Sequence, residues 1–331
     1  MRFLFRPSVE QRAALQEQLT RVRQPAAILE LLGPILPVGF RAGAAVTECA
    51  ELSVHPDRFV VRVRLRAPSG AKQVYVLKAY ADDFAERVWA YARSLTPYRD
   101  ALPGDICLPI HHLPLQRMLV FPWVAGRPVT EHGGDEAPAM LRGMAELTAA
   151  VHRLTVVPPP EPPTTVAMIL EEAWDRCRRV RDRWPDVIPV LAPLLADLED
   201  AANSVDPADP APVHGDLDTA QTLWTGERVV LLDLDMFGYT DPAYDVGHCL
   251  AQMERRNAPP AWLEAFRDSY LAANPSVSAR NVSFYRALTL TRKIHTECRL
   301  HPLERATRVP QLAARAREAL RDCVSPAAAT P

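Results

Sequence analysis

Residues 213–246 read VHGDLDTAQTLWTGERVVLLDLDMFGYTDPAYDV, and this stretch decides the interpretation of the chain. Two largely apolar runs, residues 221–224 and 229–232, flank a short turn that contains Gly226. Apolar runs joined by so short a glycine-containing turn predict a β-hairpin. The hairpin would place the carboxylate of Asp216 in the loop before its first strand, and the carboxylate of Asp233 at the end of its second strand.

This arrangement of carboxylates suits phosphoryl transfer. That reaction needs a positioned hydroxyl, a carboxylate that accepts its proton, and a divalent metal ion held by oxygen ligands. In protein kinases a catalytic Asp is followed five residues later by an Asn and, after a strand, by a metal-binding Asp. Asp216, Gln221 and Asp233 stand at the same spacing. A lone HGD motif would favour an ordinary Asp-rich turn, but the combination of HGDLD, a side-chain amide, LDLD and DPAYD favours the functional interpretation.

The stretch resembles the signature of the aminoglycoside phosphotransferase and choline kinase-like family, which has the protein-kinase-like fold. That family typically reads HGDLHxxN, then a strand ending in IDW or IDFD, then GDPxxDLA; this chain has HGDLDTAQ, VVLLDLD and YTDPAYDVG. The resemblance implies that Asp216 is the catalytic base and that Gln221 and Asp233 bind the metal ion. It also implies that Asp245 is buried and braces the catalytic loop, and that His214 holds this loop by hydrogen bonds rather than acting as a base.

Gln221 is a departure from the Asn of the family. Gln offers the same carbonyl ligand on a side chain that is one methylene longer. The metal ion could therefore still bind, or catalysis could be weakened as in a pseudokinase. We favour retained activity, because both carboxylates are present. Asp218 replaces a frequent His and has no assigned role, and Asp235 either shares metal binding or faces solvent.

Residues 44–80 predict a three-stranded β-meander, because alternating apolar and polar residues are interrupted by two short turns. The meander ends in VYVLKAY, which contains Lys78. A lysine at the end of a strand is commonplace, but the resemblance implies that this one holds the α- and β-phosphates of ATP. A lysine with that role needs a carboxylate partner. Glu86, on a helix predicted over residues 82–95, is the first choice, and Asp82 or Asp83 could replace it.

Residues 117–127, RMLVFPWVAGR, resemble the strand and hinge of the family. The resemblance implies that main-chain groups from Phe121 to Trp123 contact the adenine. The expected architecture is an α+β, two-lobed protein-kinase-like fold with a small β-rich N-terminal lobe and a larger, mainly helical C-terminal lobe.

The predicted N-terminal lobe covers residues 1–122, with a helical decoration over 1–40 and the β-meander plus helix over 44–122. The predicted C-terminal lobe, residues 123–331, carries the catalytic and acceptor-binding residues. Helical spacing of apolar residues predicts the remaining helices. They are expected at residues 8–33, broken at Pro25, and at 136–154, 243–256, 259–273, 281–300 and 310–322, with one or two helices over 166–202. His152 is expected to pack or to satisfy backbone groups, residues 156–165 to be an extended connector, and the tail from residue 325 to be disordered.

Composition excludes several classes of protein. A length of 331 residues, 48% of them hydrophobic, is enough for one large or two smaller domains. A net charge of −2 without a basic patch argues against nucleic acid as a partner. No apolar run is long enough for a membrane span or a signal peptide, and the six cysteines lack metal-ligand spacing. We therefore expect a cytoplasmic monomer or homodimer with reduced thiols, without a membrane partner.

The charge of the C-terminal part bears on the acceptor. From residue 246 onward there are 13 Lys and Arg against seven Asp and Glu. The window FYRALTLTRKIHTECRLH brings together Arg286, Arg292, Lys293, His295 and Arg299. A solvated basic helix face is the alternative interpretation. The balance nevertheless disfavours a polycationic drug and mildly favours a neutral or anionic acceptor, such as a sugar, a sugar phosphate or a hydroxy acid.

These observations predict an ATP-dependent phosphotransferase that uses Mg²⁺. It would move the γ-phosphoryl group of Mg·ATP to a hydroxyl of a small molecule, such as a sugar, an amino sugar or an aminoglycoside. One alternative is a nucleotide-binding pseudokinase with a regulatory or scaffold role, and another is a metal phosphatase. Protein kinase activity is not expected, because no activation loop or APE-like segment separates Asp233 from Asp245.

Overall fold

The computed structural model describes residues 6–41, 43–131, 136–156 and 162–324, so most of the predicted connector's proline run and the tail from residue 325 lie outside the described residues. The chain divides into two compact units. The N-terminal unit contains residues 2–99 and 106–125, and the C-terminal unit contains residues 100–105 and 126–331 together with Met1. The predicted lobe boundary between residues 122 and 123 stays a prediction.

The N-terminal unit is built on an antiparallel five-stranded sheet with the order β1-β2-β3-β6-β5. Its strands are β1 (Ala45–Val54), β2 (Arg58–Arg66), β3 (Lys72–Tyr80), β5 (His111–Leu113) and β6 (Met118–Pro122). The first three form the predicted meander, which is confirmed. The two later strands extend the sheet, since β6 pairs with β3 in the register Lys78↔Leu119.

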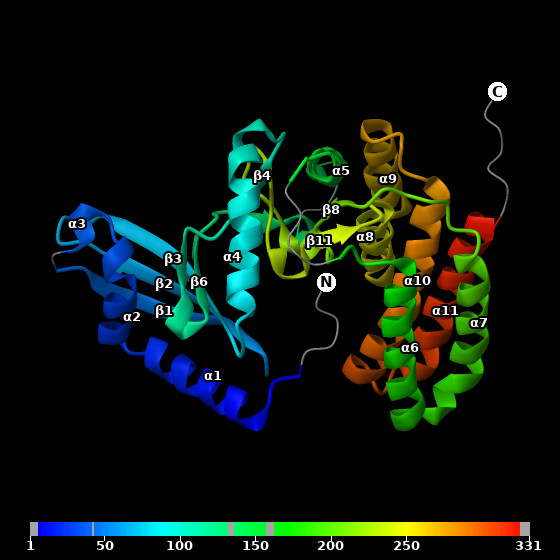
Figure 1. Cartoon of the computed structure of the whole chain (residues 1–331), viewed down its shortest axis with the longest axis horizontal. Helices are drawn as coiled ribbons and strands as arrows, with labels where there is room; N and C mark the ends of the chain where they lie inside the picture. Colours follow the sequence, from blue (N-terminus) through cyan, green and yellow to red (C-terminus); the bar gives the residue numbers. More distant parts are fainter. Residues whose placement is uncertain (1–5, 42, 132–135, 157–161, 325–331) are drawn as a thin grey trace. The chain divides into compact units, whose positions relative to one another are not determined.

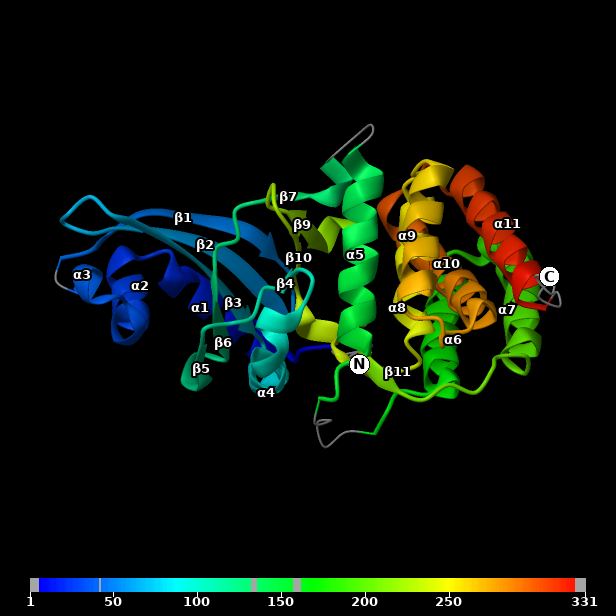
Figure 2. The same cartoon turned by 90° about the horizontal axis from the view of Figure 1, so that it is seen from above.

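The N-terminal helices form part of the core of this unit. They are α1 (Val9–Val22), α2 (Pro25–Leu32) and α3 (Val38–Arg41). Ser8 and Gln11 form a capping box at the start of α1, and Pro25 occupies the first turn of α2, which explains the break predicted there. Leu19 and Ile28 pack with Val61 of the sheet in one buried cluster. These helices therefore cover one face of the sheet, which is more than the decoration expected from sequence (Figures 1 and 2).

The C-terminal unit is mainly helical. Its helices are α5 (Glu136–His152), α6 (Val166–Arg183), α7 (Ile188–Ala202), α8 (Ala243–Arg255), α9 (Pro260–Ala273), α10 (Ala279–Leu300) and α11 (Arg305–Val324). Helix α10 packs against α6, α7, α8 and α11, and α5 packs against α9 (Figure 2). Gly247 lets α8 approach α10 closely, because a Cβ at this position would lie 2.6 Å from the backbone nitrogen of Arg286.

The C-terminal unit also contains short strands, several of which lie in or beside residues 213–246. They are β7 (Arg127–Pro128), β8 (Ala211–Val213), β9 (Thr222–Trp224), β10 (Val229–Leu231) and β11 (Gly238–Thr240), and β4 (Asp105–Ile106) precedes them. The predicted hairpin is confirmed, since β9 pairs with β10 antiparallel in the register Trp224↔Val229. Strand β8 pairs with β11, so the chain entering the HGD motif runs beside the chain that leads to Asp245.

The other predicted helices are confirmed, with one difference in extent. Helix α11 begins at Arg305, five residues before the predicted start at Pro310. Proline is common in the first turn of a helix, which favoured a start at this residue. In the structure the helix continues through Pro310, where the proline removes one backbone hydrogen bond. A smaller helix, α4 (Phe84–Leu95), belongs to the N-terminal unit. No helix within the described residues is long and apolar enough to cross a membrane, and all six cysteines are free thiols.

Candidate active site

The HGD loop requires glycine at its centre. Gly215 has a φ of +81°, a conformation that side chains rarely adopt. A Cβ at this residue would lie 2.8 Å from the carbonyl carbon of Met236 and closer still to its oxygen. The backbone of the loop is therefore pressed against the segment between β10 and β11, and Asp216 emerges from a turn that only glycine permits.

Asp245 holds the backbone of the HGD loop, as expected. Its side chain is fully buried at the start of α8. Its carboxylate accepts hydrogen bonds from the backbone nitrogens of His214 at 2.6 Å and Gly215 at 2.8 Å. Burial alone would raise the pKa of Asp245, but hydrogen bonds and nearby histidines lower it. The carboxylate therefore stays ionised and fixes two successive backbone amides of the loop.

His152 holds Asp245 in place. Its Nε2 lies 3.0 Å from Oδ2 of Asp245, and its Nδ1 lies 2.6 Å from the hydroxyl of Tyr270. His152 is thus a buried positioning residue on α5. The prediction that His152 packs is confirmed, since its ring lies edge-on to that of Tyr270, with centroids 5.5 Å apart; its polar partners are a carboxylate and a hydroxyl rather than backbone groups.

His214 ties the loop to the end of β10. Its Nε2 lies 2.7 Å from the carbonyl oxygen of Leu232, so this nitrogen must donate. Its Nδ1 then accepts a hydrogen bond from the backbone nitrogen of Asp216 at 3.4 Å. Both ring nitrogens are used within the loop, and these contacts position Asp216 next to the hairpin.

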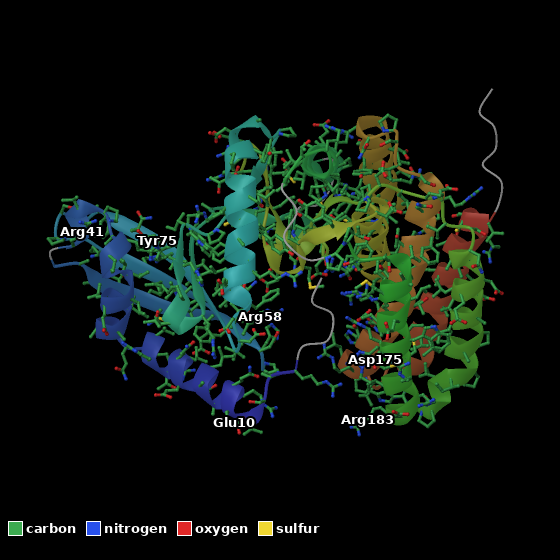
Figure 3. All side chains as sticks on the ribbon, viewed as in Figure 1. Glu10, Arg41, Arg58, Tyr75, Asp175 and Arg183 are labelled. Atoms are coloured by element: carbon green, nitrogen blue, oxygen red, sulfur yellow. The ribbon has the colours of Figure 1, made fainter. Side chains whose placement is uncertain are left out.

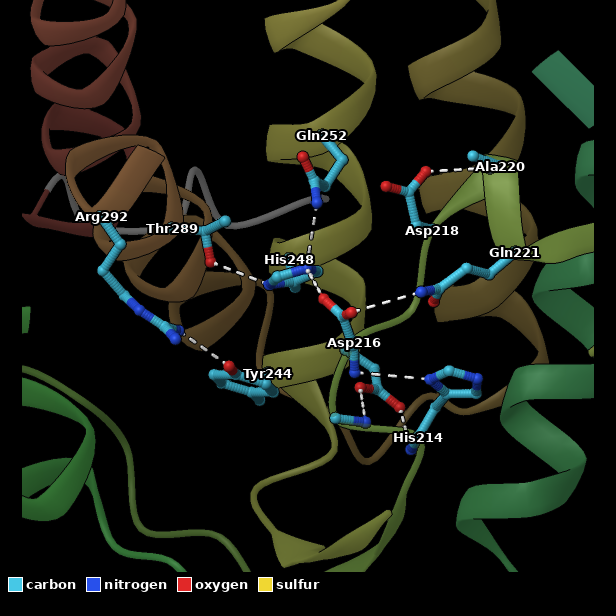
Figure 4. Close-up of polar contacts among 12 residues, drawn as sticks. His214, Asp216, Asp218, Ala220, Gln221, Tyr244, His248, Gln252, Thr289 and Arg292 are labelled. Atoms are coloured by element: carbon cyan, nitrogen blue, oxygen red, sulfur yellow. Dashed lines mark hydrogen bonds and ion pairs between the residues drawn. The ribbon is translucent and has the colours of Figure 1, made fainter. Parts of the chain in front are cut away.

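The carboxylate of Asp216 is held on both sides (Figure 4). His248 Nε2 lies 3.1 Å from Oδ1 of Asp216, and Gln221 Nε2 donates to its Oδ2 at 3.3 Å. The side chain is 40% exposed, so a substrate can reach it. Partial burial would raise the pKa of Asp216, but the hydrogen bond from His248 and the charges of His248, Lys293 and His214 hold it well below its usual range. Asp216 is therefore an ionised, oriented and accessible acceptor of hydrogen bonds.

His248 is the residue of the site that sequence reasoning missed. It is buried on α8, and Thr289 Oγ1 lies 3.5 Å from its Nδ1. Its ring stacks on that of Tyr244, with centroids 5.9 Å apart. Burial lowers its pKa, while Asp216 opposes this effect. A signal existed in the sequence, because Asp245 and His248 are three residues apart and so share one face of the helix.

Gln221 and Asp233 are brought close together through the backbone. Gln221 ends a short 3-10 helix, η6 (Thr219–Gln221), and its carbonyl oxygen accepts a hydrogen bond from Leu232 at 3.0 Å. Leu232 immediately precedes Asp233, which has a φ of +67° and accepts a hydrogen bond from the backbone nitrogen of Asp235 at 3.2 Å. The two predicted metal ligands therefore flank one backbone hydrogen bond.

The side chain of Gln221 fits a metal ligand. Its Oε1 is buried and accepts no hydrogen bond from any of the residues that the structure describes. A buried carbonyl oxygen without a donor is costly, unless a cation or a ligand completes its coordination. No group of three or more His, Cys, Asp or Glu residues within the described ranges could hold a metal ion alone. An amide oxygen and a carboxylate leave most coordination positions to substrate phosphates and water, as Mg²⁺ prefers.

Asp218, to which sequence reasoning assigned no role, has a structural one. It is buried, caps η6 by accepting from the backbone nitrogen of Ala220 at 2.9 Å, and forms a two-point ion pair with Arg256. Hydrogen bonds and charge from Arg256 lower the pKa of Asp218 against the opposing effect of burial. This pair fixes the turn that presents Gln221.

The predicted nucleotide-binding residues lie in the N-terminal unit. Lys78 is 6% exposed on β3, and its Nζ lies 5.6 Å from the centre of the Tyr80 ring. Side chains alternate along a strand, so Lys78 lies on the face opposite Leu77, which belongs to the core under α1 and α2. Glu86 lies in the first turn of α4 and is exposed, while Asp83 pairs with Arg117 at 2.9 Å. The pairing of Lys78 with Glu86 stays a prediction.

Phe121 and Trp123 are at and just beyond the end of β6. Phe121 is paired with Val76 of β3, and the backbone nitrogen of Trp123 donates to Val74 at 3.3 Å. The Trp123 ring is 39% exposed, and the guanidinium of Arg62 lies 5.1 Å from its centre. The segment predicted as a hinge thus continues the sheet that carries Lys78.

The solved structures that this chain resembles include antibiotic phosphotransferases and a choline/ethanolamine kinase family protein. An aminoglycoside phosphotransferase, APH(4)-Ia, solved with ADP and hygromycin B, is 17% identical with a TM-score of 0.62, and the match covers 91% of this chain and 99% of that one. A macrolide 2'-phosphotransferase from Brachybacterium faecium is 19% identical with a TM-score of 0.55, covering 91% and 98%. A choline/ethanolamine kinase family protein from Mesorhizobium loti is 15% identical with a TM-score of 0.56, covering 89% and 94%.

Fold and site together define a small-molecule phosphotransferase with a protein-kinase-like architecture. The model of the Phosphotransferase enzyme family matches residues 54–280, which include both Lys78 and the whole HGD stretch. The chain belongs to this family, and the resemblance seen in its sequence is confirmed. No curated protein matches it by sequence.

Proposed function

We propose that this enzyme transfers the γ-phosphoryl group of Mg·ATP to a hydroxyl of a small molecule, with Asp216 as the catalytic base. Sugars, amino sugars, aminoglycosides and similar compounds are the candidate acceptors. The observation that carries the proposal is the Asp216 carboxylate, which is accessible yet held by His248 at 3.1 Å and Gln221 at 3.3 Å. The ADP bound to a relative of the same fold supports ATP as the donor.

In the proposed reaction the acceptor oxygen attacks the γ-phosphorus while the bond to the ADP oxygen breaks. The acceptor hydroxyl donates its hydrogen bond to Asp216, and its proton passes to this carboxylate. The lowered pKa makes Asp216 a weak base that is always ionised near neutral pH. Its main contribution is therefore to orient the hydroxyl, since such transition states need little proton removal. A positioned base of this kind contributes a rate factor on the order of 10²–10⁴.

Gln221 and Asp233 would hold Mg²⁺ through the amide oxygen and the carboxylate. When bound, Mg²⁺ would neutralise charge on the phosphate oxygens. Lys78, with Glu86 as its proposed partner, would hold the α- and β-phosphates. Main-chain groups from Phe121 to Trp123 would contact the adenine. His214 would keep Asp216 in position through its two ring contacts.

The test is ADP release from Mg·ATP in the presence of pooled hydroxyl-bearing acceptors, namely aminoglycosides, choline, amino sugars, sugars and hydroxy acids. The proposal predicts that one pool stimulates ADP release, and that Asp216→Ala abolishes this stimulation while nucleotide binding persists. Absence of Mg·ATP binding to the wild-type enzyme would overturn the proposal. Full activity of Asp216→Ala would remove the proposed base.

A further inference from the structure

Lys293 is a cation that acts on the proposed base and has no ion-pair partner among the described residues. It is half-buried on α10, in the same unit as Asp216. Across residues 6–324, apart from the gaps in the described ranges, it makes no hydrogen bond or ion pair. Its charge nevertheless acts on Asp216 and helps to lower the pKa of that carboxylate.

Three arginines act on the same lysine. They are Arg176 on α6, Arg255 on α8 and Arg292 on α10, and the two other helices pack against α10. The pKa of Lys293 is lowered to about 8; desolvation is the largest cause, the three arginine charges add to it, and Asp216 opposes it. Three arginines from three helices thus act on Lys293, which itself acts on Asp216. Such mutual repulsion among like charges is common where a site binds a ligand.

A buried carboxylate, Glu172, already pairs with two of these arginines. Glu172 is 3% exposed on α6, with Arg292 Nε at 2.6 Å and a hydrogen bond from Arg176 Nε. One carboxylate therefore serves two arginines. Among the described residues, Arg176 donates a hydrogen bond through Nε and not through its terminal nitrogens, and its side chain is 24% exposed.

The second buried carboxylate is used in the same way. Glu297 is 1% exposed and pairs with Arg255 at 2.9 Å and with Arg308 at 3.2 Å. Neither carboxylate remains for an incoming ammonium group. Among the groups named here, five cations therefore outnumber three carboxylates, since Lys293 and four arginines stand against Glu172, Glu297 and Asp216. Figure 3 labels two further charged residues of α6, Asp175 and Arg183.

A continuous set of contacts links this cluster to Asp216. Arg292 Nη1 donates to the hydroxyl of Tyr244 at 2.8 Å, and Tyr244 stacks on His248. His248 in turn lies 3.1 Å from Asp216 (Figure 4). The cations and the base therefore belong to one rigid arrangement, with Lys293 and Arg176 still able to bind a ligand.

We propose that Lys293 and Arg176 bind an anionic group, a carboxylate or a phosphate, on the acceptor whose hydroxyl faces Asp216. This inference rests on the proposed function. Guanidinium and ammonium donors form strong charge-assisted hydrogen bonds with such groups. An aminoglycoside would instead place ammonium groups against these cations, which disfavours its binding. Hydroxy acids and phosphorylated sugars are therefore the acceptor class.

Binding is tested without turnover. The enzyme is saturated with a non-hydrolysable Mg·ATP analogue, so that the γ-phosphate position is filled, and inorganic phosphate is titrated in by calorimetry. Lys293→Met should weaken phosphate binding by about tenfold or more, and Lys293→Arg should retain it. Arg299→Met is the matched control, since it removes a cation from an exposed position on the same helix. Equal phosphate affinity in wild type and Lys293→Met, or no phosphate binding at all, would overturn the inference.

Acceptor pairs that differ only in an anionic group provide the kinetic test. Glycerate is compared with glycerol, gluconate with glucitol, and glucose 6-phosphate with glucose, and ADP release is measured. The charged member should have the higher kcat/KM, and Lys293→Met should raise its KM with little change in kcat. The pairs also separate a carboxylate from a phosphate. Better turnover of the neutral members, or of an aminoglycoside, would overturn this inference and leave the proposed function standing. An ATP analogue that fails to bind would overturn both the proposed function and this inference.

Discussion

The imidazole Nε2 of His248 lies 3.1 Å from Oδ1 of Asp216. A histidine of α8 therefore orients a carboxylate that is 32 residues earlier in the chain. Because the ionised carboxylate can only accept, the ring donates to Asp216 through Nε2, and Thr289 Oγ1 lies 3.5 Å from the other ring nitrogen. The orientation of the proposed base thus depends on how α8 and α10 pack beneath the loop.

Replacing His248 should affect turnover more than nucleotide binding. In His248→Ala the carboxylate loses a hydrogen bond worth roughly 1–3 kcal/mol, so kcat should fall on the order of ten- to a hundredfold. The KM for ATP should change little, because His248 does not belong to the predicted nucleotide-binding residues. Thr289→Val, which removes only the 3.5 Å contact, should have a smaller effect on kcat. Wild-type kcat in His248→Ala would show that this contact has no catalytic importance.

Two glycines provide a matched pair for the HGD loop. Gly215 and Gly226 both have positive φ, at +81° and +96°, but a Cβ at Gly226 meets nothing within 4 Å. Gly226→Ala should cost about 1 kcal/mol in the free energy of unfolding, from backbone strain alone. Gly215→Ala should cost roughly 2–4 kcal/mol more and remove activity, because it also collides with Met236. Urea unfolding of both variants measures the difference, and equal costs would contradict the close approach described for the loop.

Asp245 should contribute to stability in a pH-dependent way. Its folded-state pKa is below the ordinary value of 3.8, so its contribution is fully present above that value and is lost as the pH falls through the folded value. Asp245→Asn should cost on the order of 2–4 kcal/mol near neutral pH, because donors from the loop lose their ionised acceptor. Unfolding free energies from pH 7 downward check this prediction. The difference between wild type and variant should shrink below pH 3.8, and a difference that stays constant there would contradict the assignment.

Much of this architecture could be predicted from the sequence because it is encoded locally. The hairpin follows from two short runs and a glycine turn, and the meander from alternation along its strands. The burial of Asp245 was expected from the resemblance of the DPAYD segment, and the structure places two loop amides on its carboxylate.

The remaining features arise from contacts that no local pattern encodes. The spacing of His248 from Asp245 puts both on one face of α8, but its contact with Asp216 joins residues 32 positions apart and is seen only in the folded chain. Lys293 likewise belongs to a run of basic residues that the sequence shows. The pairing of Glu172 with two nearby arginines could not be predicted, because Glu172 lies on α6, far away in the sequence. The core role of α1 and α2 likewise depends on the sheet against which they fold.

Gln221 should govern the requirement for metal. In Gln221→Ala the buried amide oxygen is lost, so the Mg²⁺ concentration for half-maximal activity should rise roughly 10- to 100-fold. Gln221→Asn keeps an amide oxygen on a shorter side chain and should have an intermediate effect. The measurement is the Mg²⁺ dependence of ADP release, together with Mn²⁺ binding in the presence of ADP. If Gln221→Ala leaves both unchanged, the amide oxygen is not a metal ligand.

The central claim is that Asp216 is the base of a phosphotransferase, and the most direct test follows the phosphoryl group itself. Label from the γ-position of ATP is traced into the acceptor in wild type and in Asp216→Asn, a variant of nearly the same size, while nucleotide affinity is measured in parallel. We predict that wild type forms the labelled phosphate ester, and that Asp216→Asn forms it on the order of 10²–10⁴ times more slowly with nucleotide affinity retained. Label transfer at the wild-type rate in Asp216→Asn would contradict the claim.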